Sequence, residues 1–363
     1  MYFNKLSLRG FRNYVENTVE FHPKINIITG KNAQGKTNLL EGLSLMSMGK
    51  SFRTGRDNEM IGFDMESCRV VANFTKDGLE REIQIELNRG GKRIRVDGIP
   101  KEKNADLLGN VYLVVFSPED LKIVKEDPEK RRRFMDRELC QIRPMYYRNL
   151  GRYKKALIQR NNLLKKGNVR SVEIEPWDDI LADYGTKLIG ERRDFINKLN
   201  RISKDLHYRI TGGKERLDLV YESSIPLEDS VAEQRITFLS ILDKERSKDA
   251  IRGSTGFGPH RDDIKLSVDG IDVRHFGSQG QQRTAALSLK LAELGIINEE
   301  TGENAVLLLD DVFSELDGDR QEFLIKNLKD NQLFITTADL SEKLIYRLSD
   351  YKVLHVEGGR VTE

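Results

Sequence analysis

Residues 25–46 read INIITGKNAQGKTNLLEGLSLM, and this stretch decides the fold expected for the chain. INIIT is short and β-branched, which is typical of a buried strand, and TNLLEGLSLM is typical of a helix. Between them, GKNAQGKT at residues 30–37 matches G-x-x-x-x-G-K-[ST] in full. Such a loop directs backbone N–H groups and the positive end of the helix at a phosphate. The stretch therefore predicts a P-loop in an α/β fold.

The residue types of this loop indicate a nucleoside triphosphate and a metal ion. Lys36 is expected to reach the β- and γ-phosphates, and the Thr37 hydroxyl is expected to ligate Mg²⁺. ATP and Mg²⁺ are the predicted cofactors. The residues expected to bind the nucleotide in this loop are Gly30, Lys31, Asn32, Ala33, Gln34, Gly35, Lys36, Thr37 and Asn38.

A pair of carboxylates follows a second apolar run, AVLLLDDV at residues 305–312. At the end of a buried strand in the same sheet, Asp310 is expected to hold the Mg²⁺ shell. Asp311 is placed to orient or deprotonate an attacking water, so we expect a catalytic role for it beside Lys36. The alternative is that the two aspartates only cap the next turn.

A second phosphate-like turn begins in FGSQGQQRTAALSLKLAE at residues 276–293. Residues 278–282, here called the serine turn, lead directly into a helix that Ser278 is expected to cap. Within one subunit this turn is surplus, so we expect Ser278, Gly280 and Gln281 to meet the γ-phosphate of a second subunit's ATP, with a catalytic role for Ser278. Two chains would then form a head-to-tail dimer around two nucleotides. The alternative is an ordinary capped helix.

The order of strand and helix patterns predicts three segments. Residues 1–117 read mostly as strands and residues 118–252 mostly as charged helices, after which strands return over residues 253–363. We therefore expect one α/β sheet in an ATPase lobe built from both chain ends, with an inserted helical lobe.

Charge is distributed unevenly along the 363 residues, although the net charge is only +2. Residues 118–216 hold 25 Lys and Arg against 16 Asp and Glu, while the remainder holds 35 against 42. A basic segment favours a polyanion partner, and a solvated helical face is the alternative. The residues expected to contact such a partner are Arg148, Arg152, Lys154, Lys155 and Arg160. The run from Lys130 to Arg133 is expected to divide between structural ion pairs and contacts with the polyanion.

Other features concern the compartment of the cell. The two cysteines, Cys68 and Cys140, have no metal-binding spacing, which favours a reducing environment. There is no apolar signal core at the start and no run of about 18 apolar residues. We expect a cytoplasmic protein with no membrane partner.

Taken in order, the motifs resemble those of ATP-binding-cassette ATPases: P-loop, serine turn, Asp310–Asp311, then SELD at Ser314 to Asp317. The helical segment separates Lys36 from Ser278, an arrangement similar to that in the heads of SMC-like DNA-repair ATPases. Five segments resemble the RecF family within that group. They are residues 16–43, FSPEDLKIVKEDPEKRRRFMDRE at 116–138, GPHRDDIKLSVDG at 258–270, GSQGQQRTAALSLKLAE at 277–293 and LLLDDVFSELD at 307–317.

The resemblance implies further properties. An SMC-head-like ATPase fold is implied, and Arg12 in LSLRGFRNY would contact ATP. ATP would drive dimerisation and binding to double-stranded DNA, and slow hydrolysis would reset both. RecR and RecO would be partners in loading the RecA recombinase at gapped DNA. Asp311 stands where cassette ATPases usually have Glu, which fits a slow switch.

The role of the GPHRDD segment is open between two alternatives. His260 and Arg261, in the GPHRDD segment, could sense the nucleotide or bridge the lobes, but a buried structural His260 is an equal alternative.

Two other classes of protein are alternatives for the whole chain. A small-molecule kinase would use the P-loop but not the serine turn. A structural SMC-type chromosome protein would need a long heptad arm, which the helical segment is too short to provide.

Overall fold

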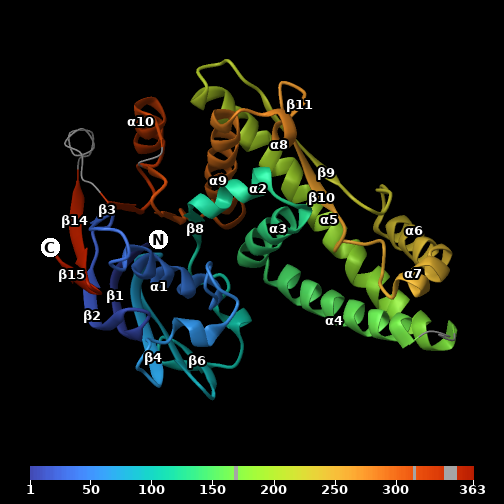
Figure 1. Ribbon diagram of the computed structural model, residues 1–363, viewed down its shortest axis with the longest axis horizontal. Coiled ribbons are helices and arrows are strands. Elements are labelled where there is room, and N and C mark those ends of the chain that lie inside the picture. The colour runs from blue at the N-terminus through green and yellow to red at the C-terminus, as the bar shows by residue number, and fades with distance from the viewer. Residues whose placement is uncertain (167–170, 314–315, 339–349) are drawn as a thin grey trace. The chain divides into compact units, whose positions relative to one another are not determined.

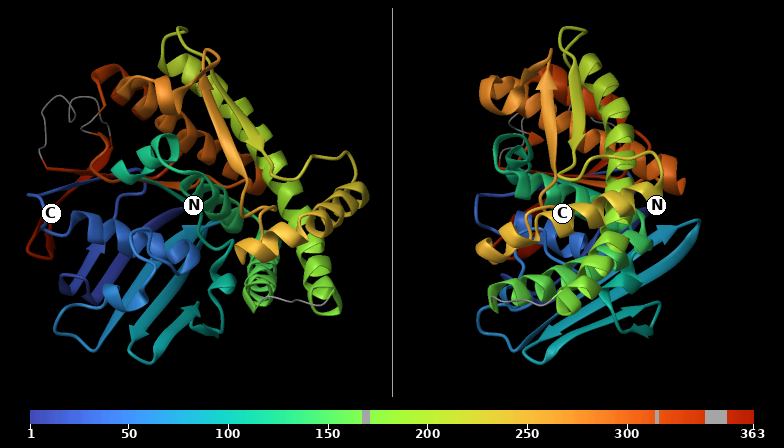
Figure 2. Two further views of the ribbon diagram at one scale, coloured as in Figure 1. Left: turned by 45° about the vertical axis from the view of Figure 1, so that its right-hand side comes forward. Right: turned by 90° about the vertical axis from the view of Figure 1, so that its right-hand side faces the viewer.

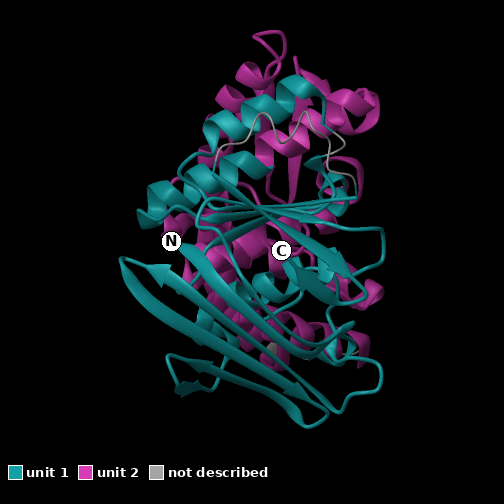
Figure 3. Ribbon diagram, turned by 90° about the vertical axis from the view of Figure 1, so that its left-hand side faces the viewer, with its two compact units in different colours: residues 1–121, 290–363 teal, residues 122–289 magenta. Residues whose placement is uncertain are grey.

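The structure is a computed structural model that describes residues 1–166, 171–313, 316–338 and 350–363 (Figure 1). The chain divides into two compact units, coloured separately in Figure 3. The first unit combines Met1–Leu121 with Lys290–Glu363, and the second is Lys122–Leu289. The first unit therefore contains both ends of the chain, as the sequence predicts.

The first unit contains a six-stranded sheet that joins distant parts of the sequence. Its order is β15-β14-β3-β13-β12-β8, and all neighbours are parallel except β14 and β15. The strands are β3 (Ile25–Thr29), β8 (Leu113–Phe116), β12 (Val306–Leu309), β13 (Leu333–Thr337), β14 (Tyr351–Glu357) and β15 (Arg360–Thr362). Every residue of β8, β12 and β13 is buried, which explains their continuous apolar runs.

The other strands of the first unit form a separate antiparallel sheet, so the expectation of one sheet is wrong. Its order is β2-β1-β4-β5-β6-β7. The strands are β1 (Tyr2–Phe11), β2 (Tyr14–Glu20), β4 (Ser67–Lys76), β5 (Leu79–Asn88), β6 (Gly91–Val96) and β7 (Ile99–Lys101). Burial alternates along β4, for example, because only one face of this sheet is covered.

The helix that follows the P-loop, α1 (Lys36–Met48), packs against strands of both sheets. Buried side chains of α1 and of both sheets form one hydrophobic core. The first unit also contains helix α10 (Gly318–Asn327) and the 3₁₀ helices η1 (Asp57–Met60), η2 (Asn104–Leu107) and η3 (Pro118–Asp120). Helices α2 (Leu121–Lys125) and α9 (Gln279–Thr301) have residues in both units.

The second unit is mainly helical but has a small sheet of its own. Its helices are α3 (Pro128–Ile142), α4 (Pro144–Lys166), α5 (Ser171–Ile210), α6 (Val231–Lys244), α7 (Arg246–Arg252) and α8 (Val273–Phe276). The sheet is β11-β10-β9, with β9 (Leu217–Glu222), β10 (Asp263–Val268) and β11 (Ile271–Asp272). Figure 2 shows β9 and β10 side by side along α5.

This small sheet changes the predicted division of the chain. The sequence places residues 253–289 in the ATPase lobe, whereas the compact units place them in the helical unit. The reason is that β10 pairs along its whole length with β9 and with no strand of the first unit, among the described residues. Strand pairing over a long sequence separation is not visible in a local pattern.

Candidate nucleotide site

The P-loop has the backbone that its glycines predict. Gly30 and Gly35 have φ values of 147° and 122°, which side chains other than hydrogen rarely allow. A Cβ atom on Gly30 would lie 2.2 Å from the carbonyl oxygen of Val356 in β14. Lys36 is buried, and its Nζ donates to the carbonyl oxygens of Gly30 at 2.7 Å and Lys31 at 3.2 Å. The loop is therefore closed around the lysine ammonium.

Asp310 and Thr37 are brought together by the order of the parallel sheet. β3, β13 and β12 are parallel neighbours, so their carboxyl ends lie at the same edge of the sheet. The Thr37 hydroxyl donates to Asp310 Oδ1 at 2.9 Å although the two residues are 273 positions apart. The Thr336 hydroxyl, at the end of β13, lies 3.1 Å from the same oxygen. The predicted Thr37 and Asp310 thus share one oxygen-rich position with Thr336.

The electrostatics of this position suit a hard cation. Burial raises the pKa of Asp310, and the neighbouring Asp311 carboxylate raises it further, while hydrogen bonds from Thr37 and Thr336 oppose both effects. Removing a buried carboxylate from water disfavours its charged form, and a divalent cation would reverse that preference. A hydroxyl and a carboxylate are ligand types that Mg²⁺ prefers. Thr37 and Asp310 therefore fit the predicted ion.

Asp311 follows Asp310 with an unusual backbone. Its φ is 53°, and its N–H donates to the Thr336 hydroxyl at 2.8 Å. Non-glycine residues seldom adopt this left-handed conformation, and aspartate is among those that tolerate it. The turn separates the directions of two consecutive carboxylates, so Asp310 is buried and Asp311 is partly exposed.

Arg12 is held by a buried carboxylate of α1. Its Nε donates to Glu41 Oε2 at 2.9 Å and its Nη2 donates to Glu41 Oε1 at 2.7 Å. Glu41 is fully buried, and Arg53 Nη1 lies 3.5 Å from its Oε2 while donating to Asn38 Oδ1 at 2.7 Å. Glu41 was not predicted from the sequence, although a lone acid in the apolar segment LLEGL is a signal for a buried ion pair.

A hairpin that was not predicted from the sequence supports the P-loop. The turn between β14 and β15 donates Gly359 N–H to the Gln34 carbonyl at 3.0 Å and Gly358 N–H to Gln34 Oε1 at 2.7 Å. Asn13 Nδ2 donates to the same Gln34 carbonyl at 2.8 Å. No local sequence pattern in residues 350–363 predicts a contact with Gln34.

The serine turn, in the second unit, has reciprocal cap bonds. Ser278 Oγ accepts from Gln281 N–H at 3.2 Å, and Gln281 Oε1 accepts from Ser278 N–H at 2.9 Å. This is a capping box, with Gln281 at the third helical position. Ser278, Gly280 and Gln281 lie at the exposed start of α9. In the SELD segment, Ser314 and Glu315 lie outside the described residues, and Asp317 caps α10 by accepting from Arg320 N–H at 3.0 Å.

The five residues predicted to contact DNA lie on α4, but one of them does not face solvent. Arg160 has no exposed area; its Nε is 2.5 Å from Asp178 Oδ1 and its Nη1 is 2.7 Å from Asp249 Oδ2. The prediction for Arg160 is therefore wrong, because two buried carboxylates hold the guanidinium inside the helical unit. The remaining four, Arg148, Arg152, Lys154 and Lys155, are exposed.

Two of the consecutive basic residues in α3 support the structural reading. Arg131 is buried and its Nε lies 2.6 Å from Asp263 Oδ1. Arg132 donates from Nη1 to the Asp262 carbonyl at 2.8 Å. These contacts tie α3 to the start of β10, so the two arginines stabilise the helical unit.

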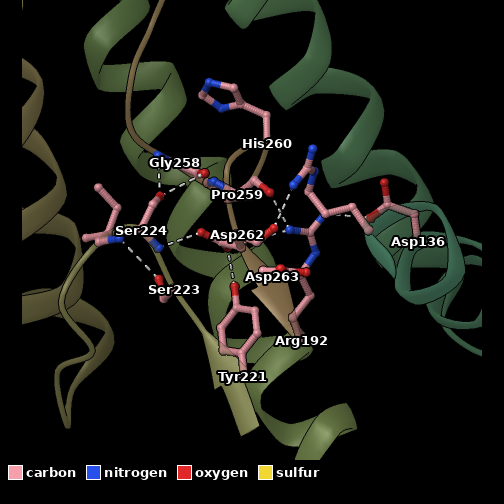
Figure 4. Close-up of polar contacts among 12 residues, drawn as sticks. Asp136, Arg192, Tyr221, Ser223, Ser224, Gly258, Pro259, His260, Asp262 and Asp263 are labelled. Carbon is pink, nitrogen blue, oxygen red and sulfur yellow. Dashed lines mark hydrogen bonds and ion pairs between the residues drawn. The ribbon is translucent and has the colours of Figure 1, made fainter. Parts of the chain in front are cut away.

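The GPHRDD segment lies in a network of hydrogen bonds and ion pairs within the second unit (Figure 4). Arg192 of α5 donates to the Pro259 carbonyl at 2.6 Å and to Asp136 Oδ1 at 2.7 Å, and its Nη1 lies 3.6 Å from Asp262 Oδ2. His260 lies between the Tyr153 hydroxyl at 2.7 Å and the Thr255 carbonyl at 3.0 Å. Burial lowers the pKa of His260 to about 4. These contacts are those of a neutral structural histidine.

Comparisons with known proteins identify the family. Residues 2–345 match the family model for the RecF/RecN/SMC N terminal domain. The chain is 43% identical over 363 residues to the DNA replication and repair protein RecF of Clostridioides difficile, covering 99% of this chain and 98% of that protein. The chain belongs to the RecF family.

Solved structures agree with this membership of the RecF family. A structure of the recombination mediator protein RecF with ATP, of the RecFOR pathway, matches with a TM-score of 0.92 and 37% identity, covering 99% of this chain and 97% of that one. An Smc head domain from Pyrococcus furiosus matches with a TM-score of 0.56 and 16% identity, covering 99% and 95%, and shows the fold. The RecF-family chain thus has the predicted SMC-head-like ATPase fold. Among its described helices, none combines the length and apolar character needed to cross a membrane.

Proposed function

We propose that this RecF-family chain is an ATP-dependent switch in DNA repair. ATP binding drives head-to-tail dimerisation and binding to double-stranded DNA, and slow hydrolysis reverses both. With RecR and RecO, the DNA-bound form assists the loading of RecA at gapped DNA. The observation that carries the proposal is the 2.9 Å contact between Thr37 and Asp310, which joins the P-loop to the strand-end carboxylate.

In the proposed reaction, four residues of the first unit have separate roles. Lys36 binds the β- and γ-phosphates, while Thr37 and Asp310 hold Mg²⁺. When bound, Mg²⁺ supplies positive charge that stabilises the negative charge of the reacting phosphate oxygens. Asp311 orients the attacking water. Because its side chain is one methylene shorter than that of Glu, it reaches less far, and we expect slow turnover.

The serine turn completes the site of the partner copy. Its capping box already satisfies the Ser278 backbone, which leaves the exposed start of α9 to face an incoming γ-phosphate. The other predicted contacts with ATP, from Gly30, Arg12 and Asn38, come from the same chain as the P-loop in this proposal.

The proposed DNA contact is the exposed face of α4. The helix contains seven Lys or Arg and no Asp or Glu over 23 residues. Arg148, Arg152, Lys155 and Lys166 are exposed and follow one another at intervals close to whole helical turns, so they line one face. Such a face would neutralise phosphates without reading bases.

Sedimentation of the purified protein with Mg-ATP tests the switch. We expect ATP to dimerise the wild type and Asp311→Asn to prolong the dimer, because hydrolysis is blocked. Lys36→Met should lose nucleotide binding, and Ser278→Arg should bind ATP as a monomer. If Ser278→Arg dimerises like the wild type, the shared site is refuted and a single-chain ATPase or kinase becomes the better description.

DNA binding is tested by charge reversal on α4. Lys155→Glu should weaken binding to a short duplex and reduce the slope of log affinity against log salt by about 1. Lys329→Glu in the first unit is the matched control, since it changes the net charge equally at another exposed lysine. Equal effects of the two variants would show that α4 is not the contact surface.

A further inference from the structure

The serine turn contacts a carboxylate 63 residues before it in the chain. Gln281 Nε2 donates to Glu215 Oε1 at 3.1 Å, while the Oε1 of the same Gln281 amide accepts the Ser278 N–H. One side-chain amide therefore connects Glu215 to the backbone of Ser278. If Glu215 were removed, the amide would lose the contact that fixes its direction.

The other oxygen of Glu215 faces a buried histidine. His207 Nε2 lies 3.4 Å from Glu215 Oε2, and His207 has no exposed area. His207 Nδ1 is 3.1 Å from Ser288 Oγ, which itself lies 2.8 Å from the Thr284 carbonyl oxygen. With its proton on Nε2, a neutral His207 points an N–H at the carboxylate and leaves Nδ1 as an acceptor toward the Ser288 hydroxyl. His207 Nε2, which makes no hydrogen bond within the described chain, is aimed at the carboxylate.

The backbone beside Glu215 is also held in place. Arg216 N–H donates to Asp269 Oδ1 at 3.1 Å, and Asp269 N–H donates to the Arg216 carbonyl at 2.9 Å. Glu215 N–H donates to the Thr211 hydroxyl at 3.3 Å. The carboxylate thus projects from a segment anchored both to α5 and to the turn after β10.

We propose that Glu215 is a positioning residue for the serine turn. Its carboxylate, held between His207 and Gln281, orients the Gln281 amide and through it the backbone and hydroxyl of Ser278. The proposal rests on the proposed function, in which Ser278 meets the ATP of a second copy. Glu215 itself is not expected to touch the nucleotide.

The test measures ATP affinity and dimerisation separately. A fluorescent ATP analogue is titrated at low protein concentration, and dimer dissociation is measured by sedimentation with Mg-ATP. Glu215→Ala should leave ATP affinity within about twofold but weaken the dimer about tenfold, the loss of one hydrogen bond to a charged group. Glu215→Gln should recover most of the dimer, because its amide oxygen still accepts from Gln281. Glu222→Ala, an exposed glutamate on β9, is the matched control.

A second variant covers a failure of Glu215→Ala to fold. Gln281→Leu removes the same hydrogen bond from the other side, together with the bond that Gln281 accepts from Ser278 N–H, and leaves the His207 contact intact, so it should weaken the dimer by about tenfold or more. A wild-type dimer that Glu215→Ala and Gln281→Leu leave unchanged refutes the positioning role alone. A wild type that binds ATP without dimerising refutes the proposed function, and the positioning role with it.

Discussion

At the scale of single residues, the P-loop is shaped by glycines that lie outside its motif. Gly359 has a φ of 75°, and a Cβ atom there would lie 2.2 Å from the Asn13 carbonyl oxygen. Its N–H also donates to Gln34. The turn of the C-terminal hairpin therefore needs glycine for two reasons, its backbone conformation and its close approach to another backbone.

Replacement of Gly359 separates these two reasons when it is paired with a control. Gly78 has the same φ of 75° but no atom within 4 Å of an added Cβ. Gly78→Ala should lower the free energy of unfolding by about 1 kcal/mol, the strain of a left-handed alanine. Gly359→Ala should lower it by about 2–3 kcal/mol, because overpacking adds to that strain, and should weaken ATP binding. Denaturant unfolding and ATP titration measure both effects, and equal losses would contradict the close approach.

At the scale of elements, α4 has a buried face and an exposed face, and arginines lie on both. Its buried face includes Arg160, whose two ion pairs join α4 to α5 and α7, and Tyr153, which contacts His260. Its exposed face includes Arg152, which lies over the Tyr184 ring with its Cζ 5.5 Å from the centroid. Periodicity alone does not distinguish an inward arginine from an outward one.

Alanine at these two arginines of α4 should therefore have very different effects on stability. Arg160→Ala should lower the free energy of unfolding by about 3–5 kcal/mol, because it leaves the Asp178 and Asp249 carboxylates buried without their cation. Arg152→Ala should lower it by no more than about 0.5 kcal/mol, as is usual at the surface. Urea unfolding followed by circular dichroism measures both, and similar losses would contradict the buried ion pairs.

At the scale of the whole molecule, the P-loop and the serine turn lie in different compact units. A nucleotide that joins the P-loop of one copy to the serine turn of another would couple folding, ATP binding and dimerisation. Ligands that bind only the folded state raise its stability by mass action, and so does a second copy.

The temperature of unfolding should therefore depend on protein concentration only when ATP is present. With Mg-ATP, wild-type protein should unfold at a higher temperature as its concentration rises, because dilution dissociates the dimer. Ser278→Arg should still be stabilised by ATP, but by the same amount at every protein concentration. Calorimetry at two concentrations about tenfold apart provides the measurement. A concentration dependence that persists in Ser278→Arg would place the dimer contact elsewhere.

The parts of the fold and site that depend on local chemistry could be predicted from the sequence alone. The P-loop, the strand before it, the helix after it and the buried run ending at Asp310 follow from residue type and spacing, because hydrogen bonding and burial there are set by near neighbours. The cap of α9 at Ser278 is predictable for the same reason. So is the common origin of the first unit in both chain ends, since strand patterns return after the helical segment.

Features that depend on contacts between distant residues became visible only in the folded chain. Four features involve segments that are far apart in the sequence. They are the pairing of β10 with β9, the arrangement of the strands in separate sheets, the burial of Arg160 and the hydrogen bond between Gln281 and Glu215. A charged residue on an amphipathic helix is exposed or buried according to whether a partner of opposite charge reaches it. That partner is supplied by chain topology, which local periodicity does not encode.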